Sequence, residues 1–109
     1  MKSIEVTVVR IYLTEAEAKL KPLVKRLHDG EKVRGVTIFR GISGFGASGI
    51  MHTASLLDLS LDLPVVVEFF DAPARVASIL EHLNTMVSPG HIVHWRAHMV
   101  VDDAAGTDA

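Results

Sequence analysis

The stretch Leu63-Pro64-Val65-Val66-Val67-Glu68-Phe69-Phe70 is almost continuously apolar, β-branched or aromatic. Residues of these types favour β-strands because they pack well on a pleated surface. The proline stands at the start of the run, where a missing backbone N–H disturbs a sheet least. We therefore predict a strand here, and the elements on either side of it complete the fold.

The chain upstream of this stretch begins with a second strand signal. Ile4, Val6 and Val8 alternate with polar residues, and the β-rich run continues to Tyr12. Alternation with a period of two indicates a strand with one face buried. The pattern predicts a long first strand that ends at Thr14.

Two segments show the periodicity of amphipathic helices, and each begins at a proline. The first begins at Pro22 and ends at Gly30 or Gly35, and the second begins at Pro73 and stops before Pro89-Gly90. The apolar residues that predict the buried faces are Leu23, Val24 and Leu27 in the first helix and Val76, Ile79, Leu80, Leu83, Met86 and Val87 in the second.

The remaining elements complete a ferredoxin-like order. Val36–Arg40 is predicted to be a strand, Ile50–Leu61 has helical spacing, and His91–Val101 is the last strand. The order is then β, α, β, a long loop with a short helix, β, α, β, which predicts an α+β sandwich with both helices on one face of a four-stranded antiparallel sheet. We expect residues 1–101 to form a single ferredoxin-like domain and residues 102–109 to form a disordered tail.

Strand alternation also predicts the second face of the sheet. We expect Trp95, with Val93 and Met99, to lie in the core. The opposite face mixes apolar and charged residues, which suggests a subunit interface, although a half-solvated surface is the alternative. Its expected members are Glu5, Thr7, Val9, Ile11, Val66, Glu68, Phe70, His94, Arg96 and His98.

A glycine-rich loop follows the strand Val36–Arg40 and is closed by His52-Thr53. Half of the chain's eight glycines fall within the nine residues Gly41–Gly49. Glycine lets backbone N–H groups approach a ligand, and the amides of Gly44–Gly49 could form an anion nest. We therefore place the functional site here, with a hinge that binds no ligand as the alternative, and expect Gly46→Val to abolish effector binding.

Enzyme motifs in this region lack the context they require. Gly44–Gly49 matches G-x-G-x-x-G, but Gly41–Ser43 separate it from the preceding strand, and a chain of 109 residues has no room for a dinucleotide-binding fold. Ser48, His52 and Asp58 could be written as a triad, yet no strained turn frames the serine. We expect no enzyme activity.

Composition excludes several further classes. Hydrophobic residues make up 49% of the chain and charged residues 22%, which is typical of a globular protein. No apolar run approaches the ~20 residues of a membrane span, so no membrane insertion is expected. The absence of a secretory signal and of cysteine favours the cytoplasm. With a net charge of −2 and scattered basic residues, no nucleic-acid binding is expected.

Three histidines near the C-terminus suggest a metal site, but the spacing opposes it. On a strand that rises ~3.3 Å per residue, His94 and His98 lie roughly 13 Å apart, too far to share one ion. Pairing of the histidines with Glu5 or Glu68 explains them more simply. Three copies of one histidine, among His91, His94 and His98, could still meet on a threefold axis.

Several short motifs are spread over the chain from about Val9 to Val101. They are Lys21-Pro22-Leu23, Gly35-Val36-Thr37, Arg40-Gly41-Ile42, Gly44-Phe45-Gly46, His52-Thr53-Ala54, and Asp62-Leu63-Pro64-Val65-Val66 with Glu68. In this combination they resemble the domain of unknown function 190 family, a PII-like group. The resemblance implies a homotrimer of ferredoxin-like subunits, a nucleotide or other small effector in the cleft between subunits, and a regulatory loop that engages a protein target.

We accordingly expect a non-enzymatic, PII-like regulator whose effector is unidentified, with an adenine nucleotide as the candidate. Where PII proteins hold phosphates with basic residues, this chain has Ser88-Pro89-Gly90-His91 and Arg96, and Arg10 or Arg40 could add charge. A metal-binding trimer and a structural interaction module remain as alternatives. The expected ligand-binding residues are Arg40, Gly41, Gly44, Phe45, Gly46, Ser48, Gly49, His52, Thr53, Gly90 and His91.

Overall fold

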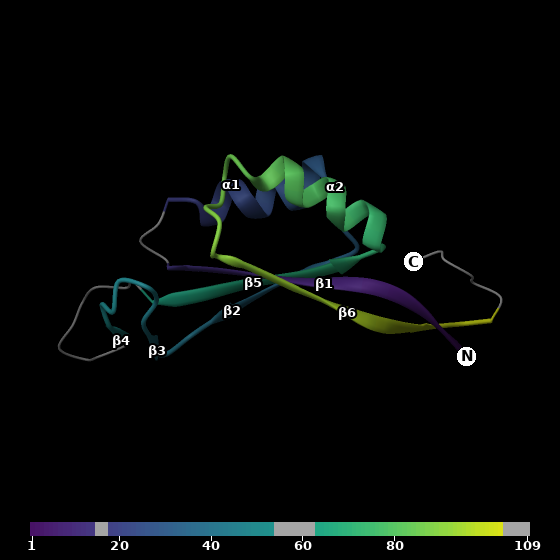
Figure 1. Ribbon diagram of the computed structural model, residues 1–109, viewed down its shortest axis with the longest axis horizontal. Helices are drawn as coiled ribbons and strands as arrows, with labels where there is room; N and C mark the ends of the chain where they lie inside the picture. Colours follow the sequence, from purple (N-terminus) through teal and green to yellow (C-terminus); the bar gives the residue numbers. More distant parts are fainter. Residues whose placement is uncertain (15–17, 54–62, 104–109) are drawn as a thin grey trace.

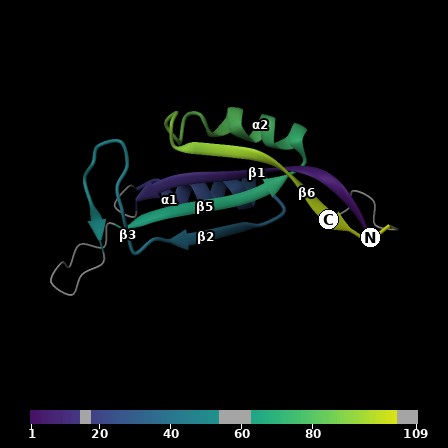
Figure 2. The same cartoon turned by 60° about the horizontal axis from the view of Figure 1, so that its bottom comes forward.

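The computed structural model describes residues 1–14, 18–53 and 63–103. A four-stranded antiparallel sheet has the order β2-β5-β1-β6, and a separate two-stranded ribbon joins β3 and β4. Both helices lie on one side of the sheet, with β2 and β6 at its edges (Figures 1 and 2). The predicted ferredoxin-like, PII-like arrangement is confirmed. The elements are β1 (Lys2–Thr14), α1 (Leu20–Lys25), a π-helical turn η1 (Arg26–Gly30), β2 (Val36–Arg40), β3 (Ser43–Gly44), β4 (His52–Thr53), β5 (Pro64–Asp71), α2 (Pro73–Leu83) and β6 (Ile92–Val101).

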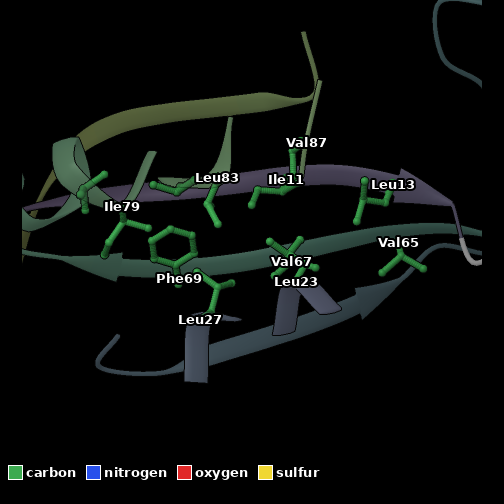
Figure 3. Close-up of a cluster of buried hydrophobic side chains, with 12 residues drawn as sticks. Ile11, Leu13, Leu23, Leu27, Val65, Val67, Phe69, Ile79, Leu83 and Val87 are labelled. Atoms are coloured by element: carbon green, nitrogen blue, oxygen red, sulfur yellow. The ribbon is translucent and has the colours of Figure 1, made fainter. Parts of the chain in front are cut away.

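The core lies between the two helices and the covered face of the sheet (Figure 3). Alternate residues of β1 and β5 point toward the helices, and from Val9 to Leu13 and from Val65 to Phe69 they are apolar. Phe69 is the largest fully buried side chain. Closely packed apolar groups of this kind supply most of the favourable free energy of folding. The main contributors are Val9, Ile11 and Leu13 of β1, Val65, Val67 and Phe69 of β5, Leu23 of α1, Leu27 of η1, and Val76, Ile79 and Leu83 of α2.

The helices begin and end slightly away from the predicted positions. Helix α1 begins at Leu20, so Pro22 lies in its first turn, where backbone N–H groups have no partner within the helix. The turn η1 continues α1 to Gly30. Helix α2 begins at Pro73 as predicted but ends at Leu83, although Val87 beyond it is also buried. None of the helices in the described ranges is long and apolar enough to span a membrane.

The predicted composition of the two sheet faces was wrong. Val9 pairs with Phe69 and His94, so Val9 and its neighbour Ile11 face the helices and are 0% exposed. Val66, Glu68 and Phe70 lie on the other side. Alternation assigns residues of one strand to two faces, but only the register between strands decides which sets share a face. We call the uncovered side the open face; it comprises Val8, Arg10, Tyr12, Thr37, Phe39, Val66, Glu68, Phe70, Val93 and Trp95.

Trp95 is also not a core residue. It pairs with Val8 on the open face and is 41% exposed, and Val93 on the same side is exposed as well. Strand β6 is an edge strand, and both helices lie on the side of the sheet opposite to the open face (Figure 2). The large aromatic ring therefore finds no packing layer within the described part of the chain.

The expected short helix over Ile50–Leu61 is wrong in its first part. His52–Thr53 forms β4, which pairs with Ser43–Gly44 of β3. The backbone pairing replaces the helical turn that the spacing of apolar residues indicated. Residues 54–62 of that segment, and residues 104–109 of the predicted tail, lie outside the described residues.

Candidate functional site

A cavity of about 400 Å³ lies where the glycine-rich loop meets one end of the sheet. The loop and the β3–β4 ribbon extend from the end at which β1 finishes and β5 begins (Figure 1). The loop after β2 forms one side of this cavity. Its lining residues are Tyr12, Leu13, Thr14, Gly44, Phe45, Gly46, Ala47, Ser48, Pro64, Val65 and His91.

Antiparallel pairing brings distant parts of the chain to this cavity. Thr14 at the end of β1 pairs with Pro64 at the start of β5. His91, directly before β6, lies beside Tyr12, whose N–H donates to the His91 carbonyl oxygen at 2.8 Å. The Gly41 N–H donates to the Pro64 carbonyl oxygen at 2.7 Å, so the loop departs next to β5. The cavity is therefore anchored to three neighbouring strands.

Gly41 is the loop glycine that the fold itself requires. A Cβ atom there would lie 2.7 Å from Cγ of Pro64 and 3.3 Å from its carbonyl oxygen, closer than real Cβ contacts allow. At Gly46 an added Cβ would meet nothing within 4 Å. Packing against Pro64 therefore requires glycine at position 41. At position 46 the subunit leaves room for a side chain, so a requirement for glycine there would come from a ligand.

The loop is held together by a few local hydrogen bonds. Gly49, with φ +76°, adopts the left-handed conformation that favours glycine, and its N–H donates to the Gly46 carbonyl oxygen at 3.0 Å. The Ile50 N–H donates to Oγ of Ser48 at 3.3 Å. Two amides near the expected anion nest are therefore used inside the loop. In the described part of the chain, the amides of Gly46 and Ala47 have no hydrogen-bond partner.

His91 is fixed by its neighbour on β1. Its Nδ1 lies 2.9 Å from the Tyr12 carbonyl oxygen. A carbonyl oxygen only accepts hydrogen bonds, so Nδ1 must carry the proton. In the neutral imidazole, Nε2 is then an acceptor. His91 thus brings one oriented hydrogen-bond acceptor to a cavity that is otherwise mostly apolar.

The residues that line the cavity include no Lys, Arg, Asp or Glu, and Arg10 lies outside the lining. Arg10, on the open face, donates from Nε to Oε1 of Glu68 at 2.8 Å, and its guanidinium lies 5.8 Å from the Phe39 ring and 5.7 Å from the Trp95 ring. The hydrogen bond to Glu68, followed by that to Tyr12, raises the pKa of Arg10 above its usual value. The charge of this arginine, two residues before Tyr12 of the cavity wall, is therefore already paired.

The structure brings some of the predicted site residues together and leaves others apart. Arg40 ends β2 and is exposed, and Gly90, with φ +94°, forms the turn before His91. For His52 and Thr53, the structure gives backbone pairing with Gly44 and Ser43. The predicted residues that line the cavity are Gly44, Phe45, Gly46, Ser48 and His91, whereas Arg40, Gly41, Gly49, His52, Thr53 and Gly90 are not among its lining residues.

Sequence reasoning missed one wall of the cavity. Tyr12, Leu13 and Thr14 come from the end of β1, and Pro64 and Val65 come from the start of β5. Both strands were predicted, and in an antiparallel sheet the end of one strand lies beside the start of its neighbour. The missing information was that β1 and β5 are neighbours.

The histidines of β6 do not assemble a metal site within the described part of the subunit, where no group of three or more His, Cys, Asp or Glu side chains could hold an ion. Glu5 lies opposite His98 in the register of β1 and β6, but the ion pairs of Glu5 and Glu68 in the described subunit are with arginines, so their pairing with histidines stays a prediction for contacts between subunits. Glu5 lies 3.5 Å from Nε of Arg96, and Glu68 binds Arg10. Arginine side chains reach these carboxylates across neighbouring strands.

Solved structures with a similar fold include PII-like proteins and CutA1. CPII from Thiomonas intermedia K12, bound to ADP and bicarbonate, matches with a TM-score of 0.62 and 22% identity, over 92% of this chain and 91% of that chain. A putative PII-like signaling protein from Thermus thermophilus matches with a TM-score of 0.61 and 16% identity, over 93% of each chain. CutA1 from Oryza sativa gives 0.61 and 13%, over 96% of this chain and 89% of that one. Identities this low establish a shared fold.

Sequence comparison identifies closer relatives. A UPF0166 protein of Aquifex aeolicus is 33% identical over 88 residues, which cover 77% of this chain and 84% of the relative. A UPF0166 protein of Methanocaldococcus jannaschii is 27% identical over 95 residues, 83% of this chain and 86% of that protein. The family model of DUF190, described as Uncharacterized ACR, matches residues 6–99. Since that match covers nearly the whole described fold, the chain belongs to the domain of unknown function 190 family.

Proposed function

We propose that this protein is a homotrimeric, non-enzymatic regulator that binds an adenine nucleotide beside its glycine-rich loop. The observation that carries the proposal is the cavity, because it joins the loop to the rigid ends of β1 and β5. A ligand there contacts both a fixed wall and a segment that can change shape. Similar folds bind such ligands: structures of CPII contain ADP, AMP and bicarbonate.

The chemistry of the cavity suits the uncharged part of a nucleotide. Tyr12 and Phe45 supply aromatic surface, and Ser48 and His91 supply hydrogen-bonding groups. A volume of about 400 Å³ falls within the ~300–1,000 Å³ usual for small-molecule sites. None of the lining residues is Lys, Arg, Asp or Glu. The base and ribose therefore fit this wall better than the phosphates do.

Phosphate groups then require charge from outside the cavity wall. Arg40 ends β2 where the loop begins, one residue before Gly41. The amides of Gly46 and Ala47 add two donors that the described structure leaves unused. A neighbouring subunit would supply the remaining cations, so the site is complete only in the assembly.

The open face is the surface on which we propose that subunits meet. Tyr12, Phe39 and Trp95 are 43%, 46% and 41% exposed. Exposed aromatic side chains gathered on one face of a protein often mark an interaction site. Tyr12 also lines the cavity, so contact through the open face would place a second subunit at the edge of the effector site.

Regulation would proceed by population shift. An effector that contacts Phe45 and the loop amides favours one loop conformation, and a target protein that prefers this conformation binds more tightly. By linkage, the target raises effector affinity by the same factor. This reciprocity gives a quantitative test once both ligands are known.

The test is a thermal-shift panel followed by titration calorimetry. We expect ADP, ATP or AMP, at ~100 times its Kd, to add about 2.7 kcal/mol of apparent stability. Phe45→Ala removes cavity surface and should weaken binding about tenfold, whereas Ile42→Ala, in the same loop but 80% exposed and outside the cavity, should not. Stabilisation by zinc or copper alone, at one ion per three chains, would instead support the histidine site. No response to any compound would contradict effector binding.

A further inference from the structure

The polar side chains of the cavity differ in how firmly their donors and acceptors are fixed. Tyr12, Thr14 and Ser48 each contribute a hydroxyl group, and His91 contributes an imidazole. A hydroxyl group both donates and accepts, and its hydrogen rotates to suit the partner. These three side chains can therefore pair with an amino group or with a carbonyl oxygen of a ligand. Among the described residues that line the cavity, His91 alone has a side chain whose donor and acceptor the subunit fixes in place.

The backbone of β1 determines which ring nitrogen of His91 carries the proton. Nδ1 of His91 lies 2.9 Å from the Tyr12 carbonyl oxygen, and the Tyr12 N–H donates to the His91 carbonyl oxygen at 2.8 Å. This reciprocal pair holds both the backbone and the ring of His91 against one residue of β1. Because Nδ1 must be the donor, the neutral ring has its lone pair on Nε2. Nε2 is thus fixed as a hydrogen-bond acceptor.

The surroundings of His91 favour the neutral ring. A carboxylate beside a histidine stabilises the imidazolium form, which donates from both nitrogens. The lining residues of the cavity include no Asp or Glu. In the described part of the chain, none of the ion pairs involves His91. At pH 8 the ring therefore presents an acceptor to a ligand.

We propose that His91 selects the base of the effector, because its Nε2 accepts a hydrogen bond from the 6-amino group of adenine. This inference rests on the proposed nucleotide site and adds the side chain that reads the base. A 6-oxo purine, such as hypoxanthine or guanine, has a carbonyl oxygen in the same position. Two acceptors that face one another form no hydrogen bond, and the unpaired groups weaken binding. The aromatic rings of Tyr12 and Phe45 suit either kind of base, so the discrimination falls to His91.

The first experiment compares ADP with inosine 5′-diphosphate, which has hypoxanthine in place of adenine, by titration calorimetry at pH 8. We expect ADP to bind about tenfold more tightly. His91→Leu should weaken ADP binding about tenfold and change inosine diphosphate binding by less than about twofold, so the preference is lost. His28→Leu, at an exposed histidine of η1 that does not line the cavity, should retain the preference.

Two outcomes of this titration separate the base-reading role from the nucleotide site itself. Equal affinities of the parent protein for the two nucleotides would overturn the role of His91 and leave nucleotide binding in place. No binding of either nucleotide would overturn the proposed function together with this inference.

The second experiment uses His91→Gln to separate a fixed acceptor from a general need for a polar side chain. The glutamine amide has an acceptor oxygen and a donor NH₂ group, and it can turn either one toward the ligand. We expect His91→Gln to keep the ADP affinity within about threefold and to bind inosine diphosphate about fivefold more tightly than the parent protein does. An undiminished preference for ADP in this variant would overturn the proposal, since the shape of the site would then select the base.

The third experiment observes the proton on His91 directly. Nitrogen-15 NMR chemical shifts distinguish the two neutral forms of the ring, and the loss of signals in His91→Leu assigns them. We expect Nδ1 to carry the proton at pH 8 without nucleotide, and the Nε2 signal to move when ADP is added. A proton on Nε2 would overturn the proposal, because Nε2 would then donate and would favour a 6-oxo purine.

Discussion

The two faces of the four-stranded sheet differ in how they are covered. On the covered face, Val67 and Phe69 of β5 are buried against the helices in an apolar cluster. On the open face, their neighbour Glu68 binds Arg10, and aromatic rings on β2 and β6 flank the pair. The subunit covers one face of the sheet with its own helices and leaves the other face uncovered in the described part of the chain.

The ion pair between Arg10 and Glu68 bears on the proposed contact between subunits through the open face. An unpaired charge in an interface carries a large desolvation penalty, whereas a hydrogen-bonded pair carries much less. Arg10 and Glu68 are joined before any partner arrives, and the arginine lies over two aromatic rings. Closing the open face would therefore leave both of these charges paired. The following substitutions test this comparison in order of their expected effect on the free energy of unfolding.

The largest expected effect comes from adjacent phenylalanines on β5. Phe69→Ala leaves a cavity between the sheet and the helices and should lower the free energy of unfolding by about 3–5 kcal/mol. Phe70→Ala removes a half-buried ring on the open face and should lower it by less than half as much. Urea unfolding of both variants measures the difference. Equal losses of unfolding free energy would show that the open face stabilises the isolated subunit as much as the core does.

A smaller effect is expected at the base of the loop. Gly41→Ala forces a methyl group against the ring and carbonyl oxygen of Pro64 and should destabilise the protein by about 1–3 kcal/mol. Gly46→Ala, where the space is open, should change stability by less than about 0.5 kcal/mol. Thermal unfolding of the two variants tests whether the base of the loop is packed against the sheet while its tip is not. A larger loss of stability in Gly46→Ala than in Gly41→Ala would contradict this arrangement.

The third prediction concerns Glu31, which joins Arg26 of η1 to His82 of α2. Burial pushes the pKa of Glu31 up, but hydrogen bonds from His82 at 3.0 Å and Arg26 at 2.7 Å outweigh it, and the net pKa is lowered. A lowered carboxyl pKa stabilises the fold above the ordinary value of 4.5, and that stability is lost as the pH falls through the folded-state pKa.

Glu31→Gln should therefore destabilise the protein at pH 6 by about 1 kcal/mol, and the difference from the parent protein should shrink as the pH falls below 4.5. Denaturant midpoints measured between pH 3 and pH 6 provide the test, because this range includes the ordinary carboxyl pKa of 4.5 and lower pH values. Glu68→Gln, on the open face, is the matched control and should have a smaller effect in the dissociated subunit. A pH-independent loss at Glu31 would contradict the role of its charge.

The smallest effect on the subunit should come from Trp95→Ala. The ring is 41% exposed, so its removal should change the unfolding free energy of the dissociated subunit by less than about 1 kcal/mol. The same change should shift the proposed trimer toward monomers, because aromatic anchors dominate interfaces. Sedimentation velocity over a range of concentrations measures this. An unchanged trimer would show that the open face is not the contact between subunits.

Local sequence signals predicted the elements well because they depend on near neighbours. Alternation and β-branched residues located the strands at Val36–Arg40 and Pro64–Asp71, and Pro73 marked the start of α2. The glycine-rich loop was found because its composition is unusual at any position in a fold. Helical spacing from Ile50 misled, because β3 offered the backbone of His52–Thr53 a pairing partner that local periodicity does not reveal.

The candidate site was predicted only on its loop side. Phe45, Ser48 and His91 were identified from loop position and residue type, but Tyr12 and Pro64 were missed, since they belong to apolar strand signals. Knowing that β1 and β5 are neighbours, and that Thr14 pairs with Pro64, is what places both at the cavity.

The sequence alone determined the order of the main strands and helices, the glycine-rich loop and the family, because each is written in residues close together along the chain. Only the tertiary structure decided which residues share a sheet face, that Trp95 and Arg10 lie together on the open one, and that the end of β1 closes the cavity. The physical reason is register. A shift of one residue between strands moves every side chain to the opposite face, and the register is fixed by packing between distant segments.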